Sequence, residues 1–534
     1  MFNETHTLNG NRMYKWNEDR SLRMQAGYTH DVIRHQRGNT QIYYQPTDTI
    51  QIDETYHYRL RSDAANLELR YEDNSNRNYI SNRFTMDGEI NHGRSEELGQ
   101  TLRTSRLSAG NYFNLIRNRE NSTWEFRSAT QYAYQPASLL LEEGKSKFNQ
   151  HSFYTDNSAA YLRKYNGFTQ QYKAGIQGER ATMKYTPPTQ PNDFNASNLS
   201  LYFNPYFQLQ RGKWLATLSL ALKAQRYFSQ QRSFLFFNPS TYLRYKLDYH
   251  WTFSLYGSLK RSAGDFSELY PGLYQTDYRT WRNGNGLFPT STTQTYNLYG
   301  EYKNTVQEFF VTASLTYSRS NRNTLFEQSV SENAIVYTRR ELPNHSDSWN
   351  LSSTLSKGIY DWHLKTSLTL LLSRSNGEQL TRLTDSDPQS LLQTYRYDYL
   401  KAEPKIIWSP VDLFEAEYHA TLGYGGSKIG SDTRLKPLLD FVQRLHLTFS
   451  IGQIDLRLSG EHYRNDLGEH THLNTVFADA SLIYKRKKWR LEASLNNLFN
   501  KKKYAYTTYS ATQSYTSRLN IRPREIMATV NYQF

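Results

Sequence analysis

The stretch WLATLSLALKAQ, residues 214–225, alternates apolar and polar side chains with a period of two. In an extended chain Trp214, Leu218 and Leu222 lie on one face, and Ser219 lies on the other. Successive side chains of a strand point to opposite faces, so this stretch predicts a strand with one apolar and one polar face. The same alternation returns in four further segments: residues 251–260, 362–373, 454–461 and 526–534. The repetition predicts an all-β protein.

Composition excludes two other classes of protein. The chain has 534 residues, of which 37% are hydrophobic, yet it carries 44 Tyr, 26 Phe and 9 Trp. A disordered chain lacks aromatic residues, and a helical membrane protein needs apolar runs of about 20 residues. The densest apolar runs, Leu215–Leu222 and Leu368–Leu372, are far shorter. Because there is no cysteine, disulfides, thiolate metal sites and cysteine nucleophiles are also excluded.

The connections between the predicted strands alternate between short and long. The short ones are residues 211–213, 248–250, 358–361, 409–412, 451–453 and 485–488. The long polar ones are residues 185–198, 264–292, 320–347, 375–394, 425–434 and 500–522. An outer-membrane barrel has short periplasmic turns at one rim and long extracellular loops at the other. The sequence therefore predicts a transmembrane antiparallel up-and-down β-barrel in the outer membrane.

Tryptophan placement agrees with a barrel that crosses a membrane. Seven of the nine tryptophans lie beside a short turn: Trp16, Trp124, Trp214, Trp251, Trp362, Trp408 and Trp489. Such a ring is typical of the aromatic girdle at a membrane interface. The alternative is a soluble sheet whose apolar layer is capped by tryptophan. That alternative requires alternation, loop sorting and tryptophan placement to coincide by chance.

Counting the alternating segments predicts a barrel of about 22 strands. Segment Thr7–Trp16 is then an odd first strand, whereas barrels of this class have an even number of strands. A barrel this wide is not filled by its own side chains and is typically plugged. Neither a plug nor a signal peptide is visible in the sequence. We therefore expect residues 1–534 to be the barrel domain of a longer precursor whose N-terminal plug is absent from this chain.

Motifs that would indicate chemistry are weak. The segment Glu469–His472, with His462 nearby, has side chains that bind metals, but it is predicted to lie in a loop without a fixed ligand spacing. The glycine-rich segment Gly423–Gly430 is not followed by the helix of a phosphate-binding loop. Neither G-x-S-x-G nor H-E-x-x-H occurs. We expect no enzymatic activity, no cofactor and no metal site.

The net charge is +14, from 64 Lys and Arg against 50 Asp and Glu. Such a balance suits nucleic acid or an anionic membrane surface. The basic tracts Lys485–Lys488 and Lys501–Lys503 lie beside predicted strand ends, and no nucleic-acid-binding module accompanies them. We expect them to pair with phosphates of outer-membrane lipid and lipopolysaccharide, and we expect no nucleic-acid partner.

A first block of sequence, residues 236–272, contains Arg261 and, shortly after it, Phe266, Ser267, Glu268, Leu269 and Tyr270. These residues resemble the phrase R-x-P-x-x-x-E-L-Y, which ends an ascending strand in the middle of the barrels of the TonB-dependent receptor family. The family's next phrase, G-N-x-x-L-x-P-E, is matched by Gly284, Asn285, Leu287 and Pro289, but Thr290 stands where Glu is expected. The second block is residues 495–534, which resembles the last two strands and ends in Phe534.

The resemblance implies an outer-membrane receptor that takes up a scarce nutrient such as a metal chelate, a glycan or a peptide. It implies that the barrel-assembly machinery reads the terminal Phe534. It also implies a TonB complex that acts only through the missing N-terminal region, and it leaves a surface lipoprotein open as a further partner. Two alternatives remain: a passive pore or structural outer-membrane barrel, and a barrel-borne enzyme, for which no residue set stands out.

The long loop Asp265–Pro289 is the candidate ligand site. Its aromatic and cationic side chains are Tyr270, Tyr274, Tyr278, Arg279, Trp281 and Arg282. Loops carried on a rigid scaffold often bind ligands, and Tyr, Trp and Arg dominate binding hot spots. The alternative is that these side chains only pack the loop against its neighbours or brace it at the lipid headgroups. Both readings stay open at this point.

Overall fold

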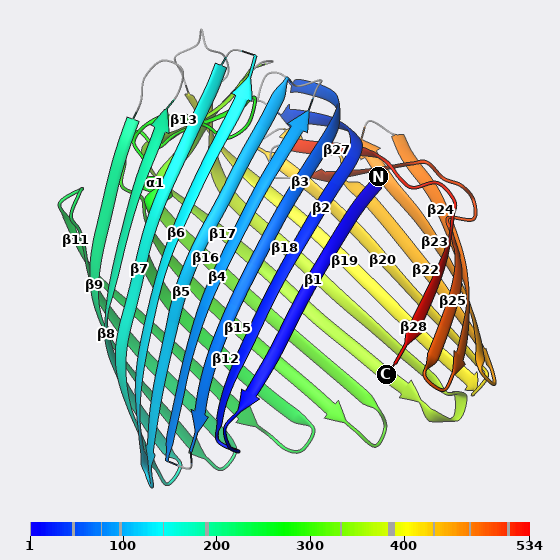
Figure 1. The fold of residues 1–534 in the computed structure, drawn as a ribbon, viewed down its shortest axis with the longest axis horizontal. Helices are drawn as coiled ribbons and strands as arrows, with labels where there is room; N and C mark the ends of the chain where they lie inside the picture. The colour runs from blue at the N-terminus through cyan, green and yellow to red at the C-terminus, as the bar shows by residue number, and fades with distance from the viewer. Residues whose placement is uncertain are drawn as a thin grey trace.

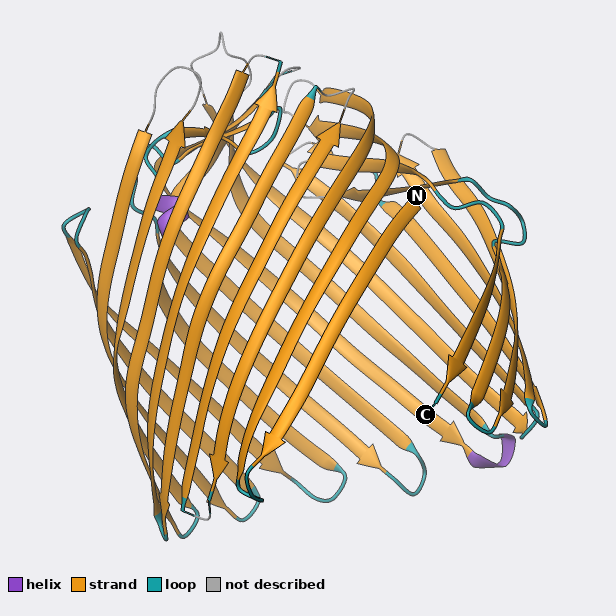
Figure 2. Ribbon diagram, viewed as in Figure 1, coloured by secondary structure: helices purple, strands orange, loops and turns teal. Residues whose placement is uncertain are grey.

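A computed structural model describes most of the chain. The described residues are 2–44, 49–75, 77–95, 99–142, 144–186, 192–331, 334–382, 390–430, 433–468, 471–509 and 513–533. They form one sheet of 28 strands, almost entirely antiparallel, that curves into a barrel (Figures 1 and 2). This confirms the predicted all-β antiparallel barrel. Among the described residues, no helix is long and apolar enough to cross a membrane.

Within the described residues, 23 of the 28 strands make up the wall. They are β1 (Phe2–Lys15), β2 (Arg20–Tyr44), β3 (Thr49–Asn74), β4 (Asn78–Ser95), β5 (Gln100–Arg119), β6 (Ser122–Leu141), β7 (Gly144–Tyr165), β8 (Phe168–Thr186), β9 (Asn192–Arg211), β10 (Trp214–Tyr227), β11 (Arg232–Lys246), β12 (Trp251–Ala263), β15 (Thr290–Asn304), β16 (Phe309–Val330), β17 (Ile335–Ile359), β18 (Leu364–Arg382), β19 (Ser390–Val411), β20 (Phe414–Ile429), β22 (Leu438–Ile451), β23 (Ile454–Gly468), β24 (Thr471–Arg486), β25 (Trp489–Asn496) and β28 (Glu525–Tyr532).

Short elements lie outside this wall. Five strands belong to the long-loop end: β13 (Leu273–Gln275), β14 (Thr280–Asn283), β21 (Thr433–Arg434), β26 (Lys503–Tyr509) and β27 (Gln513–Asn520). Helix α1 (Phe266–Leu269) lies in the loop after β12, and the 3-10 turn η1 (Tyr360–Trp362) joins two wall strands at the short-turn end.

Many wall strands are far longer than a membrane requires. Strands β2, β3 and β17 have 25, 26 and 25 residues, whereas about 9–11 residues suffice to cross. The prediction of a long loop at residues 320–347 is wrong, because β16 continues to Val330 and β17 starts at Ile335. The extension begins with the polar run Ser318–Asn323, so its sequence resembles a loop although part of it, such as Val330 and Ile335, is buried. Antiparallel pairing still satisfies its backbone.

The outer face carries the predicted apolar side chains. Leu218 and Leu222 of β10 are 40% and 39% exposed, and the seven predicted girdle tryptophans are 39–65% exposed. Met183 and Tyr185 of β8 are almost fully buried, at 1% and 2% exposed, because they face inward and are covered at the long-loop end. The barrel is therefore apolar outside, as a protein in lipid must be, and its packed core lies inside one end.

Strand β1 makes the number of wall strands odd. Both β1 and β28 run toward the short-turn end, because each is antiparallel to a neighbour that starts at that end. The described residues show no pairing between β1 and β28, and the two strands diverge across a seam (Figure 1). Strands β2 to β28 by themselves supply 22 wall strands, the number that the sequence predicts.

Strand β2 has two partners along one edge. Its upper part pairs with β27, from Arg37 opposite Leu519 to Tyr43 opposite Gln513, and its lower part pairs with β1. If the register of β27 continued through β28, residues 525–532 would lie opposite residues 31–24 of β2. Residues 5–12 of β1 occupy those positions. The first strand thus takes the place where the last strand would close the barrel.

Candidate ligand site at the extracellular mouth

The loop between β12 and β15 folds inward over the long-loop end of the barrel. It contains α1 and then the β13–β14 hairpin, whose strands pair through Leu273–Gln275 and Trp281–Asn283. Asp277 shapes the turn, because its carboxylate accepts hydrogen bonds from the backbone N–H groups of Arg279 and Thr280 at 3.0 and 2.8 Å. Side chains from three separate parts of the wall hold this loop.

The first attachment is an apolar cluster on the inner wall. The loop contributes Phe266, Leu269, Tyr270 and Phe288, and the wall contributes Ala181, Met183, Tyr185, Ala196 and Tyr227. The Phe288 ring meets the Tyr227 ring edge-on with centroids 4.8 Å apart. The Tyr270 ring likewise meets Phe194 at 5.9 Å. Burying these aromatic rings favours docking of the loop on β8–β11.

The second attachment is polar and lies on β3. Glu54 accepts a hydrogen bond from the Tyr278 hydroxyl. It also forms an ion pair with Arg279, in which the Arg279 Nη2 lies 2.7 Å from the Glu54 Oε1. The Glu54 and Arg279 side chains are only 11% and 14% exposed. Burial and the Glu54 carboxylate raise the pKa of Tyr278 above its usual value. The phenol therefore stays protonated and keeps donating to Glu54 at physiological pH.

The third attachment lies on β17. Strand β14 pairs in parallel with residues 335–338, and the Ile335 N–H donates to the Arg279 carbonyl at 2.9 Å. Arg339 is 3% exposed and lies 3.5 Å from the Glu268 carboxylate. Burial lowers the pKa of Arg339, and the Glu268 charge opposes that change. The loop thus spans the mouth from β8–β11 to β3 and β17.

The tips of two distant hairpins also meet at this end. Tyr43 of β2 and Ile52 of β3 pack against Val330 of β16 and Ile335 of β17. Figure 1 shows β2 and β3 bending over the mouth, with β16 and β17 on the far side of the barrel. Hairpin tips and the 265–289 loop together cover part of the opening.

The structure places the six predicted ligand residues in different surroundings. Tyr270 is 2% exposed, and burial raises its pKa to about 12. Tyr278 and Arg279 are held by Glu54, and Tyr274 packs beside Tyr270 with ring centroids 5.5 Å apart. Trp281 is half-buried, and Arg282 is exposed, with its guanidinium 5.8 Å from the Tyr337 ring.

Sequence reasoning missed Glu54, Arg339 and Tyr185, although each contacts the loop. Tyr185 accepts a hydrogen bond from the Gln275 N–H at 3.4 Å. Glu54 follows Asp53, and Arg339 precedes Arg340, so nothing local distinguishes these two residues from charged neighbours that face water. Their partners lie far away along the chain, and only the folded barrel brings them together.

The second family phrase makes a tight corner before β15. Gly284 and Pro289 are buried, whereas Asn285 is exposed and takes a φ of 52°, in the left-handed region that Asn tolerates. The Leu287 N–H donates to the Gly284 carbonyl at 3.2 Å, which closes the turn. A Cβ atom at Gly284 would collide with the Tyr270 carbonyl oxygen. Glycine is therefore required here for close backbone approach.

We expect Gly284→Ala to loosen the loop, because the added methyl group must push the Tyr270 backbone out of the apolar cluster. Overpacking of this kind costs about 1–3 kcal/mol. Limited proteolysis of the purified barrel measures it, with faster cleavage within 265–289. Gly286→Ala is the matched control, since the nearest atom to its Cβ position is 3.8 Å away, although its φ of 63° adds strain. If both variants resist protease like the parent, the close approach is not essential.

The remaining predicted site residues lie partly outside the described structure. Phe534, and residues 469 and 470 of the possible metal segment, fall outside the described residues. Across the ranges that are described, no group of three or more His, Asp or Glu side chains is arranged to hold a metal ion.

Comparisons with known proteins identify the fold. No family model matches the sequence, and no curated protein matches it significantly. Solved structures do match: all of this chain aligns with 80% of the copper transporter OprC, with a TM-score of 0.55 and 11% identity. Its fold is that of the TonB-dependent receptor barrels.

Two further structures agree with this receptor-barrel fold. A variant of the ferric enterobactin receptor PfeA from Pseudomonas aeruginosa aligns over 97% of this chain and 77% of its own, with a TM-score of 0.54 and 12% identity. The outer membrane transporter YddB from Escherichia coli aligns over 100% and 76%, with a TM-score of 0.53 and 8% identity. At these identities the similarity is one of fold. The chain has the fold of these outer-membrane β-barrels.

Proposed function

We propose that residues 1–534 are the barrel domain of a TonB-dependent outer-membrane receptor that takes up a scarce nutrient. The observation that carries the proposal is the loop 265–289, which is anchored on three parts of the wall and crosses the mouth. The copper transporter and the ferric enterobactin receptor that share the fold point to metal chelates as one substrate class. Glycans and peptides remain in the proposal as well.

Polar atoms of the loop and of the wall strand β17 beside it support a role beyond packing. The Tyr270 hydroxyl, the Arg279 Nε and the Arg339 Nε are buried and have no hydrogen-bond partner among the described residues. Leaving such a donor unpaired costs about 1–3 kcal/mol. Unpaired donors beside a mouth fit a loop that exchanges partners when a ligand arrives.

Coupling to a TonB complex, through a plug-bearing region outside residues 1–534, is part of this proposal. The fold of the matched receptors supports it. Assembly by the barrel machinery and contact with lipopolysaccharide or a surface lipoprotein belong to the same proposal. A passive pore or structural barrel is the competing function.

The test uses Trp281 and Arg282, because the structure gives Tyr278 and Arg279 an anchoring role that their removal would disturb. Purified full-length protein is titrated with ferric enterobactin, Cu²⁺, a maltooligosaccharide and a short peptide, and tryptophan fluorescence is followed. We expect one probe to bind, and Trp281→Ala with Arg282→Ala to weaken that binding at least tenfold. Loss of contact area and of a cation explains the size of the effect.

Trp489→Ala is the matched control, because Trp489 is 50% exposed in the girdle at the opposite rim. It should leave the affinity unchanged, and all variants should keep heat-modifiable gel mobility. Unchanged affinity in the Trp281 and Arg282 variant would remove these two residues from the site. Failure of every probe to bind, together with an open ohmic conductance in planar bilayers, would favour the passive pore.

A further inference from the structure

Residues that lie directly opposite one another on neighbouring strands form rows across β16–β20. Between two such rows the outer face changes from apolar to charged. Side chains directly opposite in antiparallel strands share a face. The first row is Leu315, Leu351, Leu372, Leu400 and Tyr424. The second row, two residues nearer the long-loop end, is Tyr317, Trp349, Arg374, Asp398 and Gly426. Aromatic residues next to cations mark the boundary between hydrocarbon and headgroups, so these rows locate the outer-leaflet interface.

A hollow of about 1030 Å³ lies at this boundary. Its apolar side is lined by the leucines of the first row, and its other side by Arg374, Arg396, Lys428 and Arg434. Gly426 ends the second row on β20 and contributes no side chain, which leaves room beside Asp398. A Cβ atom there would first meet Pro437, at 3.3 Å.

One carboxylate organises two of the cations. Asp398 accepts from the Arg374 Nε at 2.6 Å and from the Arg396 Nε at 2.8 Å, one on each oxygen. Both guanidinium groups are thus held side by side with their terminal N–H groups still available. Lys428 and Arg434 form no ion pair within the described part of the chain. Four cations against one carboxylate leave the hollow with a charge of +3.

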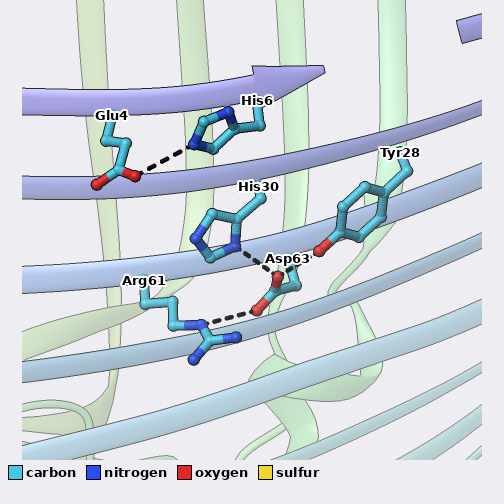
Figure 3. Close-up of polar contacts among 6 residues, drawn as sticks. All are labelled: Glu4, His6, Tyr28, His30, Arg61 and Asp63. Atoms are coloured by element: carbon cyan, nitrogen blue, oxygen red, sulfur yellow. Dashed lines mark hydrogen bonds and ion pairs between the residues drawn. The ribbon is translucent and has the colours of Figure 1, made fainter. Parts of the chain in front are cut away.

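A second charged cluster on the outer face differs from the hollow in its balance of charges. On β1–β3, Arg61 pairs with Asp63 at 3.1 Å, and His30 lies 2.7 Å from the same carboxylate (Figure 3). Glu4 adds another negative charge beside His6. Two carboxylates, Glu4 and Asp63, lie in this cluster, with Arg61 paired to Asp63 and Arg34 near Glu4. Its carboxylates offset its arginines, so it lacks the excess of cations that would attract an anion.

We propose that the hollow beside Leu372, Arg374, Arg396 and Lys428 binds one phosphorylated acyl lipid of the outer leaflet. The phosphate is recognised by the paired guanidinium groups, which offer planar sets of donors. An acyl chain lies along the row of leucines. The two parts of the hollow match the two parts of such a lipid, whereas a free phosphate uses only the cations. This site is independent of nutrient uptake and requires only that the barrel lies in the outer membrane.

The test measures lipid binding to the purified barrel in detergent, by native mass spectrometry. The probes are bis-phosphorylated lipid A, dephosphorylated lipid A and inorganic phosphate. We expect the bis-phosphorylated lipid to bind at least tenfold more tightly than the dephosphorylated one, and inorganic phosphate at tenfold excess not to displace it. The double variant Lys428→Gln/Arg434→Gln removes two cations without leaving an unpaired carboxylate. It should weaken binding of the bis-phosphorylated lipid at least tenfold.

Two further variants separate charge from shape. Gly426→Leu keeps every charge and places a side chain in the hollow beside Asp398, so it should also weaken lipid binding at least tenfold. Arg61→Gln, in the cluster on β1–β3, is the control and should leave binding unchanged. All variants must keep heat-modifiable gel mobility. Equal binding of the phosphorylated and dephosphorylated lipids, or full binding by the Lys428 and Arg434 variant, would overturn the proposal. Displacement by inorganic phosphate would show a free-anion site instead.

Discussion

Replacing Leu218 by Arg is expected to destabilise the barrel by about 2–4 kcal/mol. Leu218 lies on the outer face of β10, four residues from the girdle residue Trp214, and it is 40% exposed. In the membrane that exposed surface contacts hydrocarbon, so an arginine there loses its hydration. Urea unfolding of the barrel refolded in lipid vesicles measures the change in the free energy of unfolding.

Ser219→Arg is the matched control at the neighbouring position. Its side chain faces the interior of the barrel, where the Ser219 hydroxyl donates to Asn204 at 2.8 Å. An arginine at this position loses one hydrogen bond, worth about 1 kcal/mol, and stays hydrated in the lumen. Equal destabilisation by the two arginines would contradict the assignment of faces and, with it, the register of β10.

Arg279→Ala is expected to release the loop from β3. Removing the cation leaves the Glu54 carboxylate, which is 11% exposed, without its charged partner. Breaking a buried pair in this way costs about 3 kcal/mol, which corresponds to a factor of about 100 in an equilibrium constant. Hydrogen exchange measures the effect. The backbone amides of Thr276 and Ile335, which bond to carbonyls of the β14 segment, should exchange about 100-fold faster.

A double variant separates the lost charge from the lost contact. Glu54→Gln/Arg279→Met removes both charges, and the glutamine still accepts from the Tyr278 hydroxyl. Replacing a buried ion pair by uncharged groups is often close to neutral, so this variant should recover most of the protection. If Arg279→Ala changes exchange by less than threefold, the Glu54 pair does not anchor the loop, and the apolar cluster around Tyr270 holds it unaided.

The candidate loop shows how far sequence reasoning reached. Its aromatic and cationic composition marks residues 265–289 as unusual, and the family phrases identify Gly284 as special. The sequence does not distinguish the exposed Arg282 from the buried Arg279, because both are arginines in one polar segment. Exposure there depends on Glu54, which is separated from Tyr278 by 224 residues.

The faces of the wall strands were determined by the sequence itself. A period of two is a local property, since the covalent geometry of an extended chain sends Leu218 and Ser219 to opposite sides. Lipid outside and water inside then require an apolar and a polar face. Tryptophans beside short turns likewise report the membrane interface from local sequence. Fold class, orientation of side chains and the number of about 22 strands follow from these signals.

Tertiary structure alone decided which distant segments meet. Two extended segments, residues 5–12 and residues 525–532, could each pair with β2 and keep their apolar side chains on the outer face. In the structure, residues 5–12 pair with β2. The inward course of the 265–289 loop and the joining of Arg374 and Arg396 at Asp398 are further cases. Such contacts depend on how the whole wall curves and closes. Because backbone hydrogen bonding is the same for any pair of strands, no local pattern encodes the partner.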